Sequence, residues 1–550
     1  MQFWKATVLA TLALGAPAGS ALAETVLTLH LEEQSAWVRN FNPFNLGSRR
    51  ASTIDLIYEP LVIFNPMEGG KPYYRLATGF TFSDDLKAIT YTLRDGVKWS
   101  DGQPFTADDV KYSIDLARGN PAVDAYGMGD AVESVDVVDP HTVTVHLKAV
   151  DSTFPETFGD VPIVAKHVWS AIPDPLATAN ENPVGTGPMT EVRRFTTQVY
   201  EQCRNPNYWD AASLKIDCLK FPQIAGNDQT LAIAQSGELD WFGSFLPDIE
   251  KTYVASDPAH NHYWQPPAET VSLMFNLKTE NAGNREAFND LAFRQAVSLA
   301  MDRDSMVNVA GYGYPTANDH ASGLPPRFEV WRSKTDSAQW DAFLHYDVEK
   351  AKALLDKAGY KPGADGMRTT PSGKPISFKI LVPNGWTDWI DDSQIAIEGL
   401  RAIGIDAGVE TPELEQRTTA MIGGTFDAGL GSTLDGATPF KFYNDTYNSK
   451  SGGRVEGGSA RYSNPDLDAA LAAFRSTTDN AKQHELMGKV QDIVAANLPV
   501  IPLFNNPTWY QYSTKRFTGW ATPENPFAVP ENHDGVHTRI LHLLALRPVQ

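Results

Sequence analysis

Cysteine, long apolar runs and clusters of basic side chains are all scarce in this 550-residue chain. It contains two Cys, and its 46 Lys and Arg are outnumbered by 67 Asp and Glu, which gives a formal net charge of −21. A polyanionic partner requires a local excess of Lys and Arg, and no such run is present. Beyond the N-terminus, no apolar stretch reaches the ~20 residues that cross a bilayer. The sequence therefore predicts neither a nucleic-acid-binding protein nor a membrane-spanning one.

Short motifs for catalysis and metal binding are missing as well. Gly-x-Ser-x-Gly and His-Glu-x-x-His do not occur, and His484 with Glu485 begins a zinc motif that fails because Gly488 replaces the second His. Two further groups of histidines lack a Cys or carboxylate at a ligand spacing that would single out one ion. They are His260 with His262, and His533, His537 and His542 near the C-terminus. A secreted hydrolase stays open, since glycosidase carboxylates need to meet only in three dimensions, but the sequence predicts no enzyme, no cofactor and no metal.

The N-terminus has the features of an export signal. Lys5 is followed by an apolar run over 6–16 and by the small-x-small pattern Ala21, Leu22, Ala23, which is typical of signal peptidase cleavage. We predict that residues 1–23 form a signal peptide and that the mature chain begins at Glu24. No Cys lies near the cleavage point, so the sequence predicts a free periplasmic protein and not a lipoprotein.

The two cysteines, Cys203 and Cys218, are fifteen positions apart on either side of a turn around Pro206. In an oxidising compartment they can pair across adjacent strands. The alternative is a pair of buried free thiols.

One stretch, residues 182–210, organises the rest of the chain. Gly185 and Gly187 followed by Pro188 predict a turn in which the backbone needs freedom in φ and then a fixed φ. A loose alternation of apolar residues over 190–202 predicts a strand. Such a turn is suited to a chain that re-enters its parent sheet after an inserted domain.

Local patterns elsewhere predict a mixture of helices and strands. Thr106 and Asp109 form a capping box that opens a helix, and 132–147 alternates around a turn as a hairpin does. Toward the C-terminus, strands at 378–382 and 405–410 alternate with helices that are predicted to begin at Asp347, Asp391 or Asp392, Asn464 and Asp479. This alternation predicts an α/β fold with helices covering a sheet.

Several segments resemble one family. GTGP at 185–188, NPNYW at 205–209, RDGVKWSDG at 94–102 and LAFRQAVSLAMDRD at 291–304 are similar to segments of the family 5 extracellular solute-binding proteins, the oligopeptide and oligosaccharide receptors of ABC importers. The resemblance implies a two-lobed periplasmic binding protein fold with an additional inserted α+β domain. It also implies a monomer whose lobes close over a ligand in the cleft between them, with a permease and an ATPase supplied by other chains.

The resemblance divides the chain into three domains. Domain I is discontinuous and comprises 24–60, 183–272 and 506–550, domain II is the insertion 61–182, and domain III is 273–505. Gly185 and Gly187 are the expected hinge. With a length of 550 residues, three domains also agree with roughly 150 residues per domain.

Candidate ligand contacts come first from aromatic and amide side chains near the N-terminal strands. Phe41, Asn42, Phe44 and Asn45 flank Pro43 in a stiffened loop that can grip a polar ligand, or the rings can fill the core. Trp241 follows a turn and either lines the cleft or packs inside.

The second set of candidates separates two ligand classes. Trp386, Asp388 and Trp389 offer ring faces and a carboxylate for a sugar, in a segment similar to that of the cello-oligosaccharide binders. In peptide-binding relatives an Asp that follows a Trp receives the peptide's amino end. Asp435, with Phe440 beyond it, occupies the corresponding segment, but the Trp is missing. We therefore expect a short oligosaccharide, with an oligopeptide as the alternative and nickel, which some relatives carry, as a less favoured one.

Overall fold

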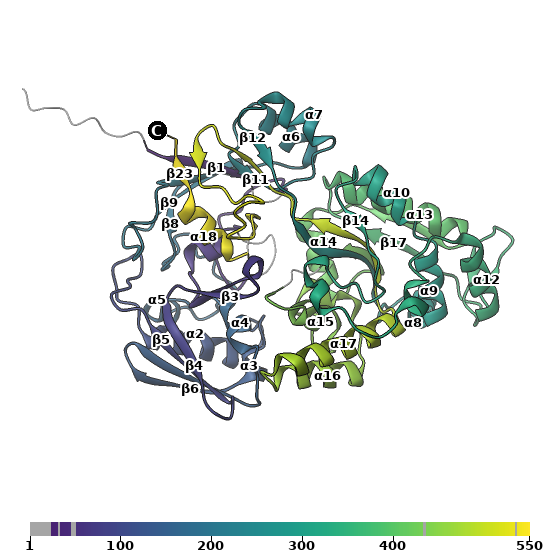
Figure 1. Cartoon of the computed structure of the whole chain (residues 1–550), viewed down its shortest axis with the longest axis horizontal. Helices are drawn as coiled ribbons and strands as arrows, with labels where there is room; N and C mark the ends of the chain where they lie inside the picture. Colours follow the sequence, from purple (N-terminus) through teal and green to yellow (C-terminus); the bar gives the residue numbers. More distant parts are fainter. Residues whose placement is uncertain (1–23, 31–32, 46–50, 433–435, 534–535, 550) are drawn as a thin grey trace, which may run out of the picture.

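The computed structural model describes residues 24–30, 33–45, 51–432, 436–533 and 536–549. Figure 1 shows two bodies side by side, one built from both ends of the chain and one from its middle. We call the body containing residues 24–263 and 511–549 the first lobe, and the body containing 267–507 the second lobe. The predicted signal peptide, 1–23, lies outside the described residues.

The first lobe is organised around a seven-stranded sheet in the order β12-β21-β11-β1-β10-β9-β8. The N-terminal strand β1 pairs in parallel with both β10 and β11, and the other pairs are antiparallel. Apolar residues of the C-terminal helix α18 (Thr538–Ala545) pack into the same core. The strands are β1 (Val26–His30), β8 (Met189–Phe195), β9 (Val199–Arg204), β10 (Cys218–Pro222), β11 (Trp241–Phe242), β12 (Asn261–Tyr263) and β21 (Gln511–Ser513).

The strand predicted over 190–202 is in fact the hairpin β8–β9. Thr196 breaks it, because its Oγ1 accepts hydrogen bonds from the backbone N–H groups of Gln198 (3.3 Å) and Val199 (3.0 Å). A hydroxyl that satisfies two backbone donors stabilises a turn over a continuing strand.

An inserted α+β unit lies between β1 and β8. Its four-stranded antiparallel sheet has the order β4-β5-β7-β6, with the predicted hairpin as β6–β7. Helix α2 (Ala107–Gly119) packs on this sheet and begins with the predicted capping box of Thr106 and Asp109. The other elements are β2 (Val62–Asn65), β3 (Lys71–Tyr74), β4 (Ala77–Phe82), β5 (Ala88–Leu93), β6 (Val132–Asp139), β7 (Thr142–Leu147) and α4 (Phe154–Gly159).

The second lobe is a six-stranded mixed sheet in the order β14-β20-β13-β19-β17-β18. Because neighbouring residues of a strand face opposite sides, Leu273 and Met274 enter two different cores, one on each face of the sheet. The strands are β13 (Pro267–Phe275), β14 (Thr316–Ala317), β17 (Ser377–Leu381), β18 (Asp406–Glu410), β19 (Ala428–Gly431) and β20 (Ile501–Pro507). The helices include α8 (Ala282–Asn289), α9 (Leu291–Leu299), α12 (Val348–Ala358), α13 (Thr387–Ala402), α14 (Leu414–Gly423), α15 (Phe440–Tyr447), α16 (Pro465–Arg475) and α17 (Asn480–Asn497).

Two adjacent segments, 264–266 and 508–510, connect the lobes. They are tied together by backbone hydrogen bonds from Trp264 N to Tyr510 O (3.1 Å) and from Thr508 N to Pro266 O (2.8 Å). The boundary predicted between residues 272 and 273 falls inside β13, all of which belongs to the second lobe. We therefore propose 264–266 and 508–510 as the domain boundaries on this side.

Gly185 and Gly187 lie where the chain returns from the inserted unit to the seven-stranded sheet, away from the two interlobe segments. Neither has a positive φ, so the predicted need for φ freedom is wrong. Both are glycine because a Cβ would overlap backbone carbonyl oxygens of α1 (Ile54–Ile57), those of Ile57 and Leu56 respectively. The backbone contact itself is a hydrogen bond from Gly187 N to Ile57 O (2.8 Å).

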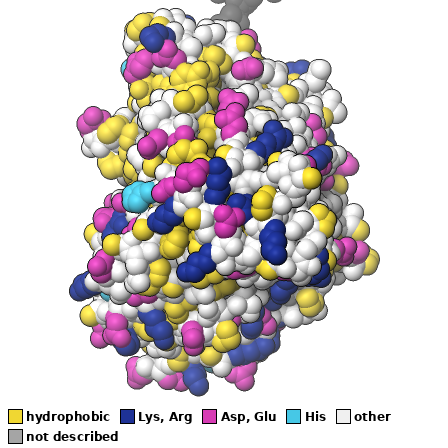
Figure 2. Space-filling view, turned by 90° about the vertical axis from the view of Figure 1, so that its right-hand side faces the viewer, with side chains coloured by type: hydrophobic (Ala, Val, Ile, Leu, Met, Phe, Trp, Pro, Cys, Tyr) yellow, Lys and Arg dark blue, Asp and Glu magenta, His cyan; other side chains and the backbone are white. Residues whose placement is uncertain are grey.

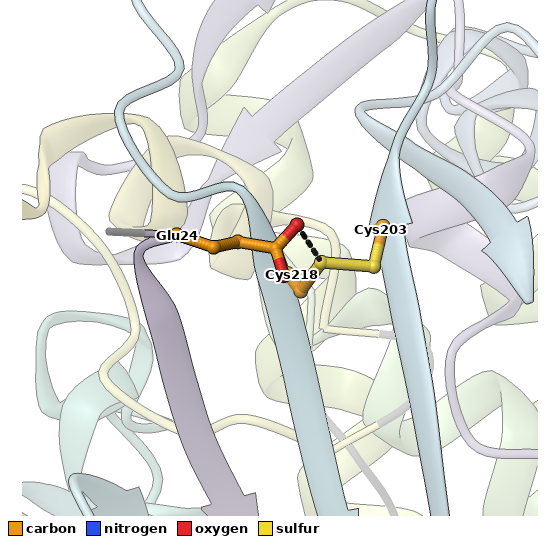
Figure 3. A group of neighbouring side chains, drawn as sticks. All are labelled: Glu24, Cys203 and Cys218. Carbon is orange, nitrogen blue, oxygen red and sulfur yellow. Dashed lines mark hydrogen bonds between the residues drawn. A yellow bond between two sulfur atoms is a disulfide. The ribbon is translucent and has the colours of Figure 1, made fainter. Parts of the chain in front are cut away.

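A disulfide joins Cys203 and Cys218 across β9 and β10 (Figure 3). The two residues face each other in the antiparallel register, which brings their side chains together. Glu24 lies beside Cys218 and completes the one group of side chains with metal-binding proximity within the described residues. Since both sulfur atoms are consumed by the disulfide, this group offers no thiolate ligand.

Candidate functional site

A cavity of about 550 Å³ lies between the lobes and is walled by both of them. We call it the interlobe cavity. The first lobe contributes side chains from the loop after β1, from α1, β2 and α4, and from the C-terminal segment. The second lobe contributes the start of α13, residues of α14 and α15, and the end of β20. No helix in the described part of the chain is both long and apolar enough to cross a membrane.

Trp386, Asp388 and Trp389 line the interlobe cavity together. The structure corrects the predicted helix start at Asp391 or Asp392, since α13 begins at Thr387, and this places the three side chains at its N-terminus. The two indole rings meet edge to face with centroids 4.9 Å apart. Trp389 also packs into the core of the second lobe, whereas the buried Nε1 of Trp386 has no hydrogen-bond partner among the described residues.

Asp388 is buried at the contact between the lobes. Its Oδ1 accepts a hydrogen bond from Nδ2 of Asn227 in the first lobe (3.3 Å). Nearby, the backbones of Gly226 and Gly385 approach closely. The backbone N–H of Asn227 donates a hydrogen bond to the carbonyl of Gly385 (3.2 Å). Burial raises the pKa of Asp388 to about 7, and the charge of Glu33 across the cavity adds to this shift.

Glu156 forms a second polar contact between the lobes. It lies on α4, and its Oε1 accepts a hydrogen bond from the backbone N–H of Ala437 in the second lobe (2.6 Å). Burial raises the pKa of the Glu156 carboxyl to about 7. Glu156 and Asp388 therefore both reach across the cleft, one from each lobe.

Two basic side chains of the cavity, Lys441 and Arg417, form ion pairs. Nζ of Lys441 bonds Asp445 (2.9 Å) and, across the cleft, Asp160 (3.3 Å). Nη1 of the buried Arg417 bonds Glu456 (2.6 Å). These pairs hold Lys441 and Arg417 against acidic side chains of the cavity wall.

In the described cavity wall, acidic side chains outnumber basic ones. Its Lys and Arg are three: Arg327, Arg417 and Lys441. Its Asp and Glu are nine: Glu33, Asp55, Glu156, Asp160, Glu269, Asp388, Asp445, Glu456 and Glu531. Aromatic side chains complete the wall: Tyr58, Phe64, Tyr126, Phe245, Trp386, Trp389 and Trp509.

A second cavity of about 800 Å³ adjoins the first between the inserted unit and α15 and α16. Tyr126, Glu156, Lys441 and Asp445 border both spaces. Phe440 lines the second cavity and not the interlobe cavity, and its ring stacks on Phe474 with centroids 5.0 Å apart.

The N-terminal loop predicted to hold the ligand is scaffold instead. Phe41 is fully buried against Phe195 and Tyr200, and Nδ2 of Asn42 donates to the carbonyls of Pro175 and Thr178. Phe44 packs edge to face on Trp169, and the backbone N–H of Asn45 donates to the carbonyl of Asn42. The interlobe cavity is not lined by Phe41, Asn42, Phe44 or Asn45. Burying the two phenylalanine rings in the core is more favourable than exposing them to water.

Trp241 is also a core residue. It is 1% exposed, and its Nε1 donates to the carbonyl of Pro530 (3.0 Å). A buried indole whose N–H already donates a hydrogen bond presents neither a ring face nor a free donor to a ligand. Asp435, the candidate for a peptide amine, lies outside the described residues.

Sequence reasoning missed most of the polar side chains of the site. Glu156, Asn227 and Arg417 come from three separate helices, and each looks like an ordinary helical residue in the sequence. Only the closing of the lobes brings them to one space, so no local pattern could have identified them.

The outer face of the second lobe contrasts with the cavity. Figure 2 looks onto this face, where acidic and basic side chains are interspersed and apolar areas are small. This visible face therefore lacks the broad basic surface that a polyanion requires. The concentration of acidic charge and aromatic rings in the interlobe cavity makes the cleft the candidate site.

Known proteins resemble this chain over most of its length. The glutathione-binding protein GsiB of Salmonella typhi is 28% identical over 468 residues, covering 82% of this chain and 84% of the relative. A periplasmic oligopeptide-binding protein from Thermotoga maritima, solved with mannohexaose bound, superposes with a TM-score of 0.86 at 28% identity and covers 96% of this chain and 99% of its own. The oligopeptide-binding protein AppA of Bacillus subtilis, solved with a nonapeptide, shares the fold with a TM-score of 0.80 at 19% identity, covering 96% of this chain and 100% of its own.

A family model covers the greater part of the chain. The description of that model is bacterial extracellular solute-binding proteins, family 5, middle region, and it matches residues 71–454. This range includes most of the inserted unit, the hairpin β8–β9 and much of the second lobe. The chain thus belongs to the family 5 bacterial extracellular solute-binding proteins, which are transport receptors and not enzymes.

Proposed function

We propose that this chain is the periplasmic receptor of an ABC importer and that it captures a short oligomer, with an oligosaccharide favoured, by closing two lobes over it. The observation that carries the proposal is the interlobe cavity with polar contacts from both sides. Glu156 binds Ala437 of the second lobe, and Asp388 binds Asn227 of the first. Ligand contacts made by both walls stabilise the closed state over the open one.

The lining of the cavity supports a sugar. Ring faces such as that of Trp386 cover the apolar C–H side of a pyranose, while carboxylates and amides bind its hydroxyls. The Thermotoga maritima relative with bound mannohexaose supports the same choice. Peptide is the alternative, supported by the glutathione-binding and nonapeptide-bound relatives. The two adjoining cavities provide room for a ligand of several units.

The remaining parts of the proposal concern export and partners. A cleaved signal peptide over 1–23, without a lipid anchor, would release the mature chain from Glu24 as a free monomer. The permease subunits that receive its ligand would be separate chains, as the resemblance implies. The hinge consists of 264–266 and 508–510, where the lobes are joined.

A thermal-shift screen of the mature chain tests the ligand class. The probes are di- to pentasaccharides, di- to pentapeptides and Ni²⁺, because a ligand that binds only the folded form raises its melting temperature. We expect oligosaccharides to give the largest shifts. Shifts with peptides alone would establish the alternative ligand, and turnover of any probe by the purified chain would contradict the receptor function.

A further inference from the structure

The acidic side chains of the interlobe cavity are not equally neutralised. Lys441 forms ion pairs with Asp160 and Asp445, and Arg417 forms an ion pair with Glu456. Asp55 is bound by Arg539 from behind the wall. Some other carboxylates that face the cavity form no ion pair with a Lys or Arg of the described residues.

Glu156 and Asp388 receive amide hydrogens and form no ion pair, although the charge of Lys441 acts on Glu156 from beyond ion-pair distance. Within the described residues, no Lys or Arg nitrogen lies within ion-pair distance of either one. Glu156 has the backbone N–H of Ala437, and Asp388 has the side-chain amide of Asn227. Burying a carboxylate without a cation is costly, so each is a position where a positive charge from outside is stabilising.

A second polar group of the same wall also lacks a partner. The side chain of Asn506, in β20, is 6% exposed and lines the interlobe cavity, and its buried Oδ1 accepts no hydrogen bond from any residue that the structure describes. A buried acceptor without a hydrogen bond costs free energy, so a hydrogen-bond donor on the ligand would be stabilising at this position. A primary ammonium group carries three donors and no acceptor.

We infer that the ligand is a cationic oligomer bearing primary ammonium groups, which Glu156 and Asp388 receive from opposite lobes. This rests on the proposed receptor function and makes its ligand class more specific. Charge-assisted bonds to buried carboxylates are about twice as strong as neutral ones. Because the two carboxylates belong to different lobes, a ligand that neutralises both is held best in the closed state. The ring of Trp386, next to Asp388, adds a cation–π surface.

Two kinds of oligomer carry such groups, amino-sugar oligosaccharides and lysine-containing peptides. The experiment compares matched pairs by isothermal titration calorimetry. Glucosamine tetramer is compared with its fully N-acetylated form and with cellotetraose. Lys-Ala-Lys-Ala is compared with the same peptide after acetylation of all its amines. Each pair keeps the chain length and changes the charge.

We expect the amine-bearing member of one pair to bind at least about tenfold more tightly than its acetylated partner. Glu156→Gln and Asp388→Asn should each lower this affinity about tenfold more than they lower the affinity for cellotetraose, because only the ammonium contact depends on the charge of the carboxylate. Asp95→Asn, on an exposed turn of the inserted unit, is the charge-matched control and should change neither. Both isosteric variants should fold, because they keep the shape of the carboxylates, and melting curves of the free variants check this.

The outcomes separate the inference from the function on which it rests. Equal affinity for charged and acetylated members, or unchanged amine affinity in both variants, overturns the inference and leaves the receptor function standing. If none of the charged or neutral oligomers binds, both are overturned. The pair that shows the difference identifies the source of the amine.

Discussion

Trp386 is half-buried and lines the interlobe cavity. A ligand that stacks on the part of its ring facing the cavity gains contact area. We predict that Trp386→Ala lowers oligosaccharide affinity by ~1 kcal/mol or more, since aromatic stacking alone is worth about 0.5–1.5 kcal/mol. Isothermal titration with the best sugar of the screen measures the change. Trp340→Ala, outside the interlobe cavity, is the matched control, and equal isotherms for both variants would remove Trp386 from the site.

At this scale the sequence distinguished poorly between rings in the core and rings in the site. Trp386, Asp388 and Trp389 line the cavity, but Phe41, Phe44 and Trp241 are buried. These aromatic residues lie in irregular segments, in a short strand or at the start of a helix, where the sequence pattern does not indicate burial. Glu156 gave no signal at all, because an acidic residue on a helix is usually solvated.

At the scale of elements, the return of the chain to the seven-stranded sheet depends on backbone packing. Gly187 lies against α1, where a Cβ would overlap the carbonyl of Leu56. We predict that Gly187→Ala destabilises the chain by about 1–3 kcal/mol, because the overlap is with backbone and cannot be relieved by a rotamer. Urea unfolding followed by tryptophan fluorescence measures this.

The control for this substitution is Gly79→Ala in β4. No atom lies within 4 Å of a Cβ added there, and the φ of Gly79 is not positive. We expect it to leave the midpoint unchanged or to raise it slightly. A Gly187→Ala midpoint equal to that of the control would contradict the packing argument.

The disulfide between β9 and β10 is the second feature at this scale. Cys203 and Cys218 are 15 residues apart, and closing a loop of this length restricts the unfolded chain by about 3 kcal/mol in the entropy model. We predict that Cys203→Ser with Cys218→Ser lowers the free energy of unfolding by about that amount. The wild type measured with a reducing agent is the control, and it should match the variant. A variant as stable as the oxidised wild type would show that the crosslink contributes nothing.

Helix starts were predicted correctly where an Asp or Asn caps the helix through its side chain. Asp347, Asn464 and Asp479 cap α12, α16 and α17 as expected. Two errors have local causes. The β8–β9 turn rests on the hydroxyl of Thr196 instead of a Gly or Pro, and α13 begins at Thr387 without a side-chain cap.

At the scale of the whole molecule, we expect the closed arrangement to respond to pH through Glu156 and Asp388. Burial raises the pKa of each to about 7 in the closed state, whereas open lobes would expose them at ordinary values. The closed state therefore binds more protons, so lowering the pH through 7 favours closing and raising it favours opening. Asp392, behind Asp388, has a raised pKa and acts in the same direction, while the pKa of Glu33 is lowered.

Ion pairs across the cleft do not reverse this trend near neutral pH. Asp130 with Arg454 and Asp160 with Lys441 have carboxyl pKa values below the ordinary range, so they weaken only under more acidic conditions. We predict a smaller radius of gyration by small-angle X-ray scattering for the ligand-free chain at about pH 5.5 than at about pH 8.5. The double variant Glu156→Gln with Asp388→Asn should show a clearly smaller difference, because only Asp392 still acts in this direction, and expansion of the wild type at the lower pH would contradict the assignment.

The lobes, the insertion and the α/β class followed from motif resemblance and from strand and helix patterns. The site did not, because it exists only where separate parts of the chain converge. Asn227 and Asp388 are 161 positions apart, and Glu156 and Ala437 are 281 apart. The boundary at 272 and 273 failed for the related reason that strand β13 starts at Pro267, before its apolar pattern becomes regular.

The central claim is that a soluble oligomer binds between the lobes. The most direct measurement is a crystal structure of the chain with the strongest ligand from the screen. The account predicts ligand density in the interlobe cavity, in contact with Trp386 of the second lobe and with residues of the first lobe such as Tyr58. Density confined to an outer surface, or touching only one lobe, would contradict it.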